Sequence, residues 1–219
     1  MGSNIHSSTL TDPEIWANLD DRMRTGDEDR WLSSRYAPLA ERRALVALYA
    51  FCWELARVRL VVSEPALGAI RFQWWRDALQ EIGDGETPRA HDVVGALVDM
   101  IAAEAYSLSS LLEIVDAYED SFETGDRSVE PETQIALLAA GVFGKDHGWT
   151  EAITTLAPHV AALRRGETVG LGPQVERAPT VIRPAIAHFR LRRRYADKKM
   201  SGPLARRFCV MRAISSGKV

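Results

Sequence analysis

The sequence predicts an all-α protein with a single domain, and three observations lead to this fold class. Apolar residues recur at helical spacing in nearly every segment. No run shows the sustained alternation of a β-strand. The 219 residues are enough for one substantial core, and no linker is obvious enough to divide them. We therefore expect one helical domain over residues 1–219.

The first two predicted helices lie in the N-terminal quarter of the chain. Asp12-Pro13 predicts a helix start, with Asp as the N-cap and Pro at the first helical position. A second, long helix is expected from about Pro38 into the fifties. Because almost every residue from Ala44 to Trp53 is apolar, this helix should be central and buried on most sides.

A third helix is predicted between a cap at Ser63 and an end at Gly83. Its expected apolar stripe consists of Leu67, Ile70, Trp74 and Ala78. The adjacent pair Trp74-Trp75 points in two directions about 100° apart, so one indole could line a pocket while the other packs in the core. Packing of both in the core is the favoured interpretation, because buried aromatic residues mostly serve packing.

The rest of the chain also carries helical periods. Further helices are predicted near Asp92, after Ser107, from Pro131, from Trp149 to Arg165, after Thr180 and after Ser201. The penultimate one should bury Ile182, Ile186 and Phe189. The segment "GETVGLGPQVERAP", before the helix predicted after Thr180, contains three Gly and two Pro, which predicts a loop.

Composition favours a soluble protein of a reducing compartment. The chain is 46% hydrophobic and 26% charged, and its apolar runs are too short to cross a bilayer. The start "MGSNIHSSTLTDPEIW" does not resemble a signal peptide. Cys52 and Cys209 have no metal-type spacing and are interpreted as reduced packing residues. We expect a cytoplasmic location, with a peripheral contact at the inner face of the membrane left open.

Basic residues are concentrated near the C-terminus. From Arg183 to Val219 there are 11 Lys or Arg and one acid, whereas the remaining residues hold 16 basic and 29 acidic ones. The consecutive Arg192, Arg193 and Arg194 fan around a helix, so at most one can face the core. They are candidates for a surface that meets an acidic protein or an anionic membrane. Nucleic acid is not expected, since the body is acidic and no nucleic-acid motif is present.

An acidic string raises the question of a metal site. "VDAYEDSF" places Asp116, Glu119 and Asp120 on one face of a helix, and such carboxylates can hold Mg²⁺ and through it a diphosphate. The favoured interpretation is an ordinary solvated acidic face. For Arg57 and Arg59, which end an apolar helix, two interpretations stay open: cations that complement the helix dipole, or an anion-binding pair beside a cavity.

A longer segment carries a family resemblance. "DRWLSSRYAPLAERRALVALYAFCWELARVRLVVSEPALGAIRFQWWRDAL" resembles the N-terminal signature of the squalene/phytoene synthase family. Those enzymes join two prenyl diphosphates head to head inside a helical cavity. The resemblance implies a bundle of the isoprenoid synthase type, shortened in this chain. It also implies candidates to line a cavity or ligand site: Tyr36, Tyr49, Trp53, Arg57 and Trp74.

The same resemblance implies where a metal would bind. In active members "YAFC" is followed by an arginine and then by a D-D-x-x-D cluster that binds the Mg²⁺ ions. Here Trp53 stands at the arginine position, and Ala56, Arg57 and Leu60 stand at the aspartate positions. This replacement removes the carboxylates and adds a cation, so the site should repel Mg²⁺. We expect no metal, no cofactor and no catalytic residue.

The family's second aspartate-rich motif should lie on a late helix. Between Thr150 and Thr180 the acids are Glu151, Glu167 and Glu176, and none is paired at helical spacing. Neither half of the family's metal site is therefore expected in this chain.

The wording "ELARVRLVVSEPALGAIRFQWW" is similar to a narrower branch of the family, formed by short bacterial members and a mitochondrial complex I assembly factor. The leading hypothesis is a non-catalytic protein that acts as a binding or assembly factor, with respiratory complex I as the implied target and a protein partner expected. The alternatives are a prenyltransferase of the squalene/phytoene synthase type and a carrier of a polyprenyl lipid.

Overall fold

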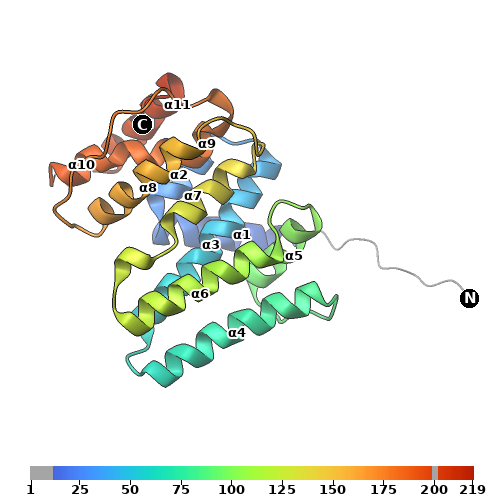
Figure 1. Cartoon of the computed structure of the whole chain (residues 1–219). Helices are drawn as coiled ribbons and strands as arrows, with labels where there is room; N and C mark the ends of the chain where they lie inside the picture. Colours follow the sequence, from blue (N-terminus) through green and yellow to red (C-terminus); the bar gives the residue numbers. More distant parts are fainter. Residues whose placement is uncertain (1–11, 199–201) are drawn as a thin grey trace, which may run out of the picture.

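The computed structural model describes residues 12–198 and 202–219, and all regular structure within them is helical (Figure 1). The α-helices are α1 (Pro13–Gly26), α2 (Glu28–Ser34), α3 (Leu39–Val61), α4 (Pro65–Gly83), α5 (Asp92–Ala102), α6 (Leu108–Thr124), α7 (Glu132–Gly141), α8 (Thr150–Arg164), α9 (Arg183–Ile186), α10 (Arg192–Ala196) and α11 (Pro203–Ser216). Short 3-10 turns are η1 (Arg127–Val129), η2 (Thr180–Ile182) and η3 (Ala187–Leu191). The predicted all-α class is confirmed.

Helix α3 is the centre of the fold, as its apolar sequence predicts. It contacts α1, α2, α4, α5, α6 and α7, and every residue from Ala44 to Cys52 is buried. A helix that is apolar on all sides must be surrounded, because no face of it gains from contact with water. Tyr106 adds a polar tie by donating a hydrogen bond to the carbonyl of Ala44 at 2.9 Å.

Two groups of helices flank this centre. At one end α4 packs along α6, with the rings of Phe72 and Phe122 5.8 Å apart. At the other end α8, α9, η3, α10 and α11 gather around α2, so the C-terminal segment lies far from α4 (Figure 1). No helix in the described residues is long and apolar enough to cross a membrane.

Several predicted helix ends are confirmed. The Asp12 side chain accepts a hydrogen bond from the Glu14 amide at 2.9 Å, with Pro13 at the first position. Ser107 caps α6 by accepting from the Ser110 amide. The segment from Glu167 to Pro179 is free of helix, as its glycines and prolines predict.

The predicted start of α4 is wrong, and so is its predicted stripe at Leu67 and Ile70, whereas Ala78 is buried as predicted. Glu64 rather than Ser63 precedes the helix, and no side chain caps it. Leu67 and Ile70 are exposed, the latter by 64%. The buried face instead consists of Gly68, Phe72, Trp75, Ala78 and Leu79. Both sets have helical spacing, and the contact with α6 selects the second.

The penultimate predicted helix is not continuous. After η2 the chain alternates between α9, η3 and α10. Ile182, Ile186 and Phe189 are buried as predicted, but so are all residues from Pro184 to Phe189, because α2, α7, α8 and α11 surround the segment. Helix α2 was not predicted. The helix predicted after Ser201 is α11, and Ser201 itself lies outside the described residues.

Candidate functional site

The family resemblance implies metal-binding aspartates at three positions of α3. The side chains present there, those of Ala56, Arg57 and Leu60, lie in different surroundings. Ala56 lines a small cavity of about 180 Å³ whose wall is formed by residues of α1, α2, α3, α6, α7 and α8. Arg57 lies over the ring of Trp53 at 4.3 Å and pairs with Glu54 at 3.4 Å. Leu60 projects into solvent and is 78% exposed. These side chains therefore do not converge on one point, as ligands of a metal must.

The side chain of Trp53 forms part of the wall of this cavity. Its indole packs against the end of α1, where Gly26 has no side chain, and a Cβ there would lie 2.5 Å from the indole nitrogen. The glycine is thus required by the close approach of the tryptophan. A large aromatic side chain occupies the position at which the resemblance implies an arginine.

Four of the charged residues in the cavity wall, Asp27, Arg30, Glu132 and Arg164, pair with one another. The guanidinium of Arg30 lies 3.2 Å from Asp27 and 2.6 Å from Glu132. Arg164 lies 3.0 Å from the same Asp27. Because each carboxylate already has an arginine partner, neither is available to a Mg²⁺ ion. Among the described residues no group of three or more His, Cys, Asp or Glu is arranged to hold a metal.

This buried network shifts the titration of its members. Burial acts to raise the pKa of Asp27, but Arg164 and Arg30 outweigh it and lower the pKa to about 2. For the neighbouring His188 burial lowers the pKa well below its usual range, and Arg30 and Arg164 lower it further. Asp27 is therefore ionised and His188 neutral at physiological pH.

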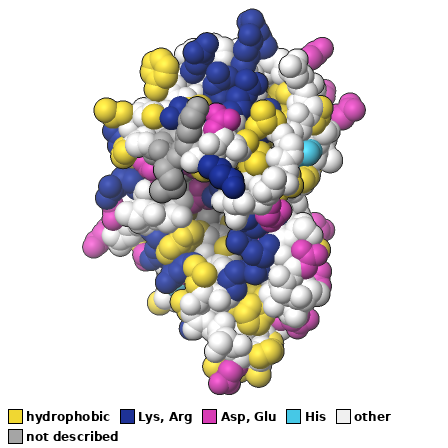
Figure 2. Space-filling view, turned by 90° about the vertical axis from the view of Figure 1, so that its left-hand side faces the viewer, with side chains coloured by type: hydrophobic (Ala, Val, Ile, Leu, Met, Phe, Trp, Pro, Cys, Tyr) yellow, Lys and Arg dark blue, Asp and Glu magenta, His cyan; other side chains and the backbone are white. Residues whose placement is uncertain are grey.

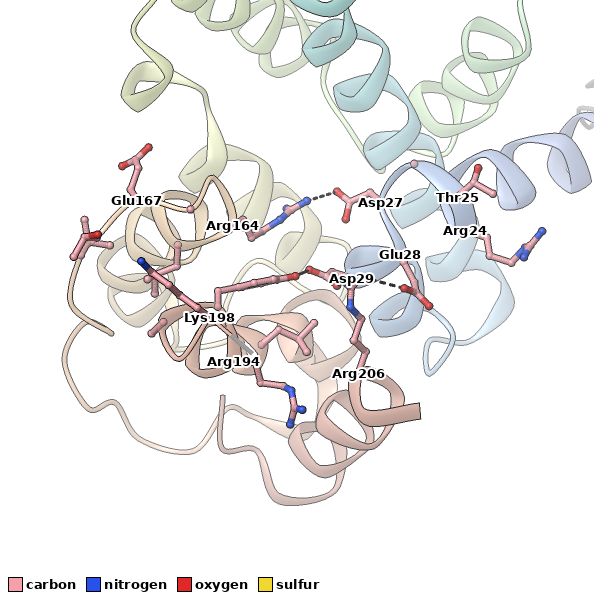
Figure 3. Close-up of a pocket in the computed structure, with 18 residues that line it drawn as sticks. Arg24, Thr25, Asp27, Glu28, Asp29, Arg164, Glu167, Arg194, Lys198 and Arg206 are labelled. Atoms are coloured by element: carbon pink, nitrogen blue, oxygen red, sulfur yellow. Dashed lines mark hydrogen bonds and ion pairs between the residues drawn. The ribbon is translucent and has the colours of Figure 1, made fainter. Parts of the chain in front are cut away.

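A larger pocket of about 740 Å³ opens beside the network (Figure 3). It lies between the α1–α2 corner, the end of α8 and the segment around α10. Tyr195 donates a hydrogen bond to Asp29, and Arg206 pairs with Glu28 at 3.1 Å. The charged residues of its wall are Arg24, Asp27, Glu28, Asp29, Arg164, Glu167, Arg194, Lys198 and Arg206. The same wall also has apolar side chains, from Leu163, Val169 and Leu191, so it is amphipathic.

The five residues proposed to line a cavity do not share one. Tyr36 is exposed in the turn before α3. Tyr49 is buried, and its hydroxyl donates to the carbonyl of Ala185 at 3.2 Å. Trp53 lines the cavity of Ala56, whereas Arg57 and Trp74 line a separate groove of about 410 Å³. The family resemblance identified these positions, but the direction of each side chain depends on its neighbours in space.

That groove lies beside an exposed apolar patch, which we define as Leu60, Val61, Leu67 and Ile70. Val61 and Ile70 line the groove together with Trp74 and Trp75. Trp75 is buried, whereas Trp74 is half-buried and packs against the core. The patch was missed in the sequence because two of its residues were assigned to the core.

The acidic string on α6 is not a metal cluster. The carboxylates of Asp116 and Glu119 both accept from Arg76 of α4, the former at 2.7 Å. Asp120 is exposed. The string therefore forms ion pairs with Arg76 of α4 and also presents a solvated face at Asp120. The solvated face was predicted, and the ion pairs with α4 were not.

Arg57 and Arg59 do not form an anion-binding pair. Arg59 donates a 2.6 Å hydrogen bond to the buried Ser121 and lies 3.3 Å from Glu130. Arg57 points to Glu54 on the opposite side. Each of the two arginines is engaged by its own carboxylate.

The proposed surface of three consecutive arginines needs correction. Arg192 is only 3% exposed and donates to the carbonyls of Leu171 at 2.8 Å and Phe189 at 3.1 Å. It therefore fixes the loop at Leu171 and contributes little exposed area, so it is not the open surface residue that the prediction requires. Arg193 is exposed and Arg194 half-buried, which agrees with the prediction that at least one stays accessible.

Comparison with known proteins identifies related sequences. The squalene/phytoene synthase family model matches residues 23–138. Assembly factor 6 of NADH dehydrogenase (ubiquinone) complex I is similar in Homo sapiens (32% identical), Rattus norvegicus (33%) and Bos taurus (30%), each over 103 residues. Each match spans 46% of this chain but only 30% of the relative's length. No solved structure matches the chain.

Proposed function

The chain belongs to the squalene/phytoene synthase family, and we propose that it is a non-catalytic member that binds a protein partner. The observation that carries this proposal is the absence of carboxylates from the part of α3 that corresponds to the family's first metal-binding motif. Ala56, Arg57 and Leu60 stand where the aspartates would be and point in different directions. The nearby carboxylates of Asp27 and Glu132 are held by arginines.

The size and polarity of the cavities argue against the two alternatives. The cavity next to Ala56 measures about 180 Å³, less than the roughly 300–1,000 Å³ of typical small-molecule sites. It is therefore too small for two prenyl diphosphates. The 740 Å³ pocket is large enough for a ligand, and nine charged residues line it, so a purely apolar chain would leave many of these charges without a partner.

The apolar patch of Leu60, Val61, Leu67 and Ile70 is the proposed partner surface. It includes one former metal position and borders a groove that holds Trp74, Trp75 and Arg57. Tryptophan and arginine are enriched in protein interfaces, and contiguous apolar residues at a surface often mark contact sites. The segment that would bind a metal in an enzyme thus carries the features of a docking site.

We further propose that the partner belongs to respiratory complex I. The support is the similarity to assembly factor 6 of complex I, which is 32% identical over 103 residues. We place the protein in the cytoplasm as a peripheral protein at the inner face of the membrane. Free thiols at Cys52 and Cys209 suit a reducing compartment, and the basic C-terminal segment suits an anionic surface.

Complementation in a cell that lacks the chain tests this role. The patch variant Leu60→Asp/Ile70→Asp is compared with Leu39→Asp/Val181→Asp, which makes the same chemical change at two exposed positions elsewhere. We expect the parent and the control to restore complex I on native gels and to co-precipitate its subunits. The patch variant should do neither while keeping its helical signal.

Two results would contradict the proposal in different ways. Normal complex I in cells without the chain would exclude the assembly role. Full restoration by Leu60→Asp/Ile70→Asp would exclude the patch as the partner surface and leave the role itself intact.

A further inference from the structure

A strongly cationic pocket lies at the C-terminal end of the molecule. It measures about 660 Å³ and is formed by the loop after Leu171, by η3 and α10, and by the end of α11. Its cationic lining consists of Arg177, Arg190, Arg192, Arg193, Arg212 and Lys218. Glu176 is the acidic side chain among the lining residues. Figure 2, which views the molecule from the left-hand side of Figure 1, shows Lys and Arg side chains crowded at the upper end of the molecule.

Ion pairs within the protein do not neutralise these charges. Among the described residues, Arg177, Arg193 and Arg212 have no carboxylate partner. Arg190 and Arg192 donate to the carbonyls of Lys218 and Leu171, each at 2.8 Å. A carbonyl accepts a hydrogen bond but carries no net charge, so the pocket keeps its excess of cations.

The pKa values of two of these arginines are lowered by burial and by the neighbouring positive charges. Burial, together with the positive charges of Arg193 and Arg190, lowers the pKa of Arg192 to about 10. Burial also lowers the pKa of Arg190, with Arg193 and Arg212 contributing in the same direction. A bound anion would relieve this repulsion, because an opposite charge nearby favours the charged form of an arginine.

Helix α11 presents an apolar stripe beside the pocket. Leu204, Phe208 and Met211 recur at helical spacing and are exposed, Phe208 by 59%. The opposite face of the helix buries Val210 and Ala213 against η3 and α9. Phe208 lies one turn before Arg212, a pocket residue, so the stripe adjoins the cationic wall.

We propose that this pocket binds the phosphate of an anionic phospholipid headgroup while the stripe of α11 enters the lipid surface. The proposal rests on the peripheral membrane contact suggested above and assigns it a site. A free phosphate ion would use the cations alone. An apolar helix face flanked by arginines is the arrangement that binds at a membrane interface.

Vesicle sedimentation tests the site with the purified chain. Phosphatidylcholine vesicles are compared with vesicles that also contain phosphatidylglycerol, and free glycerol phosphate is titrated in parallel. The pocket variant is Arg193→Glu/Arg212→Glu, at two exposed positions. The control Arg71→Glu/Lys145→Glu makes the same charge change at exposed positions on α4 and in the α7–α8 turn. Phe208→Ser tests the stripe.

The parent and the control should bind only the anionic vesicles. The pocket variant should lose at least about tenfold in binding, since each basic residue near such a surface contributes about 1 kcal/mol. Phe208→Ser should weaken vesicle binding but not any glycerol phosphate binding. The helical signal should be unchanged in all variants.

Three results would overturn the proposal. Equal losses in the pocket and control variants would show a response to net charge alone. Glycerol phosphate binding without vesicle binding would indicate a soluble phosphate ligand instead of a lipid. Vesicle binding by the pocket variant equal to that of the parent would exclude the pocket. None of these bears on the complex I role, which the complementation experiment measures separately.

Discussion

The guanidinium of Arg30 lies 2.6 Å from the carboxylate of Glu132, although 102 residues separate the two along the chain. The contact joins α2 to α7 at the cavity that Ala56 lines. Asp27 and Arg164 complete the network. The carboxylates of this cavity wall are thus paired with arginines at the place where a metal-dependent enzyme would need free carboxylates.

The first prediction concerns this pair. Glu132→Gln should lower the free energy of unfolding by about 1.5–3 kcal/mol, because it removes one of the two carboxylates that pair with the buried Arg30. Denaturant unfolding measures the change. The exposed Glu113→Gln serves as the control and should stay within about 0.5 kcal/mol of the parent.

A double variant tests whether the loss of stability comes from a buried charge that has lost a partner. Arg30→Met/Glu132→Leu removes both charges and should be more stable than Glu132→Gln alone. Parent-like stability of Glu132→Gln, or no recovery in the double variant, would contradict the description of a tightly paired interior.

The second prediction concerns pH. His188 is held neutral, since burial and then Arg30 and Arg164 lower its pKa well below its usual range. The unfolded chain takes up a proton on this group below about pH 6.5, so the unfolded state binds more protons there. The free energy of unfolding should therefore fall with decreasing pH, by up to about 1.4 kcal/mol per pH unit from this group.

Stability profiles of the parent and His188→Leu between about pH 5 and pH 8 check this expectation. The variant should lose part of the slope below about pH 6.5. A residual slope is expected from His91, whose pKa is also lowered by burial. Identical slopes in the two proteins would show that His188 is not held neutral by the fold.

The third prediction compares two leucines of one helix. Leu48 is completely buried in the middle of α3, whereas Leu39 at its start is 62% exposed. Leu48→Ala should destabilise the protein by about 2–5 kcal/mol through lost burial and a cavity. Leu39→Ala should change stability by less than about 0.5 kcal/mol. Similar losses at both positions would mean that α3 is not the centre of the core.

The sequence predicts α3 well because its apolar residues leave only one place for it, the middle of the bundle. It predicts α4 poorly because two apolar stripes compete. Ile70 and Phe72 both belong to a helical repeat, and only the contact of Phe72 with Phe122 of α6 decides which is buried. Periodicity within one helix carries no information about that distant partner.

The candidate site shows the same limit. The loss of carboxylates at Ala56 and Leu60 is visible in the sequence, and so is the cation at Arg57. The partners of Arg30 and Arg164 are not visible, because ion pairs that span 102 and 137 residues have no local pattern. Burial of Arg192 also depends on a carbonyl of the loop at Leu171.

Turnover of prenyl diphosphates tests the central claim, that this member of the family is not an enzyme. The purified chain is incubated with a prenyl diphosphate and millimolar Mg²⁺, and both diphosphate release and the squalene or phytoene product are measured. An active member of the family in the same assay serves as the positive control. The triple variant Ala56→Asp/Arg57→Asp/Leu60→Asp is measured alongside the parent.

We expect neither protein to form product above the blank. Restored aspartates alone should not suffice, because the second acidic motif is missing and Arg30 and Arg164 line the cavity. Mg²⁺-dependent product from the parent chain would contradict the account.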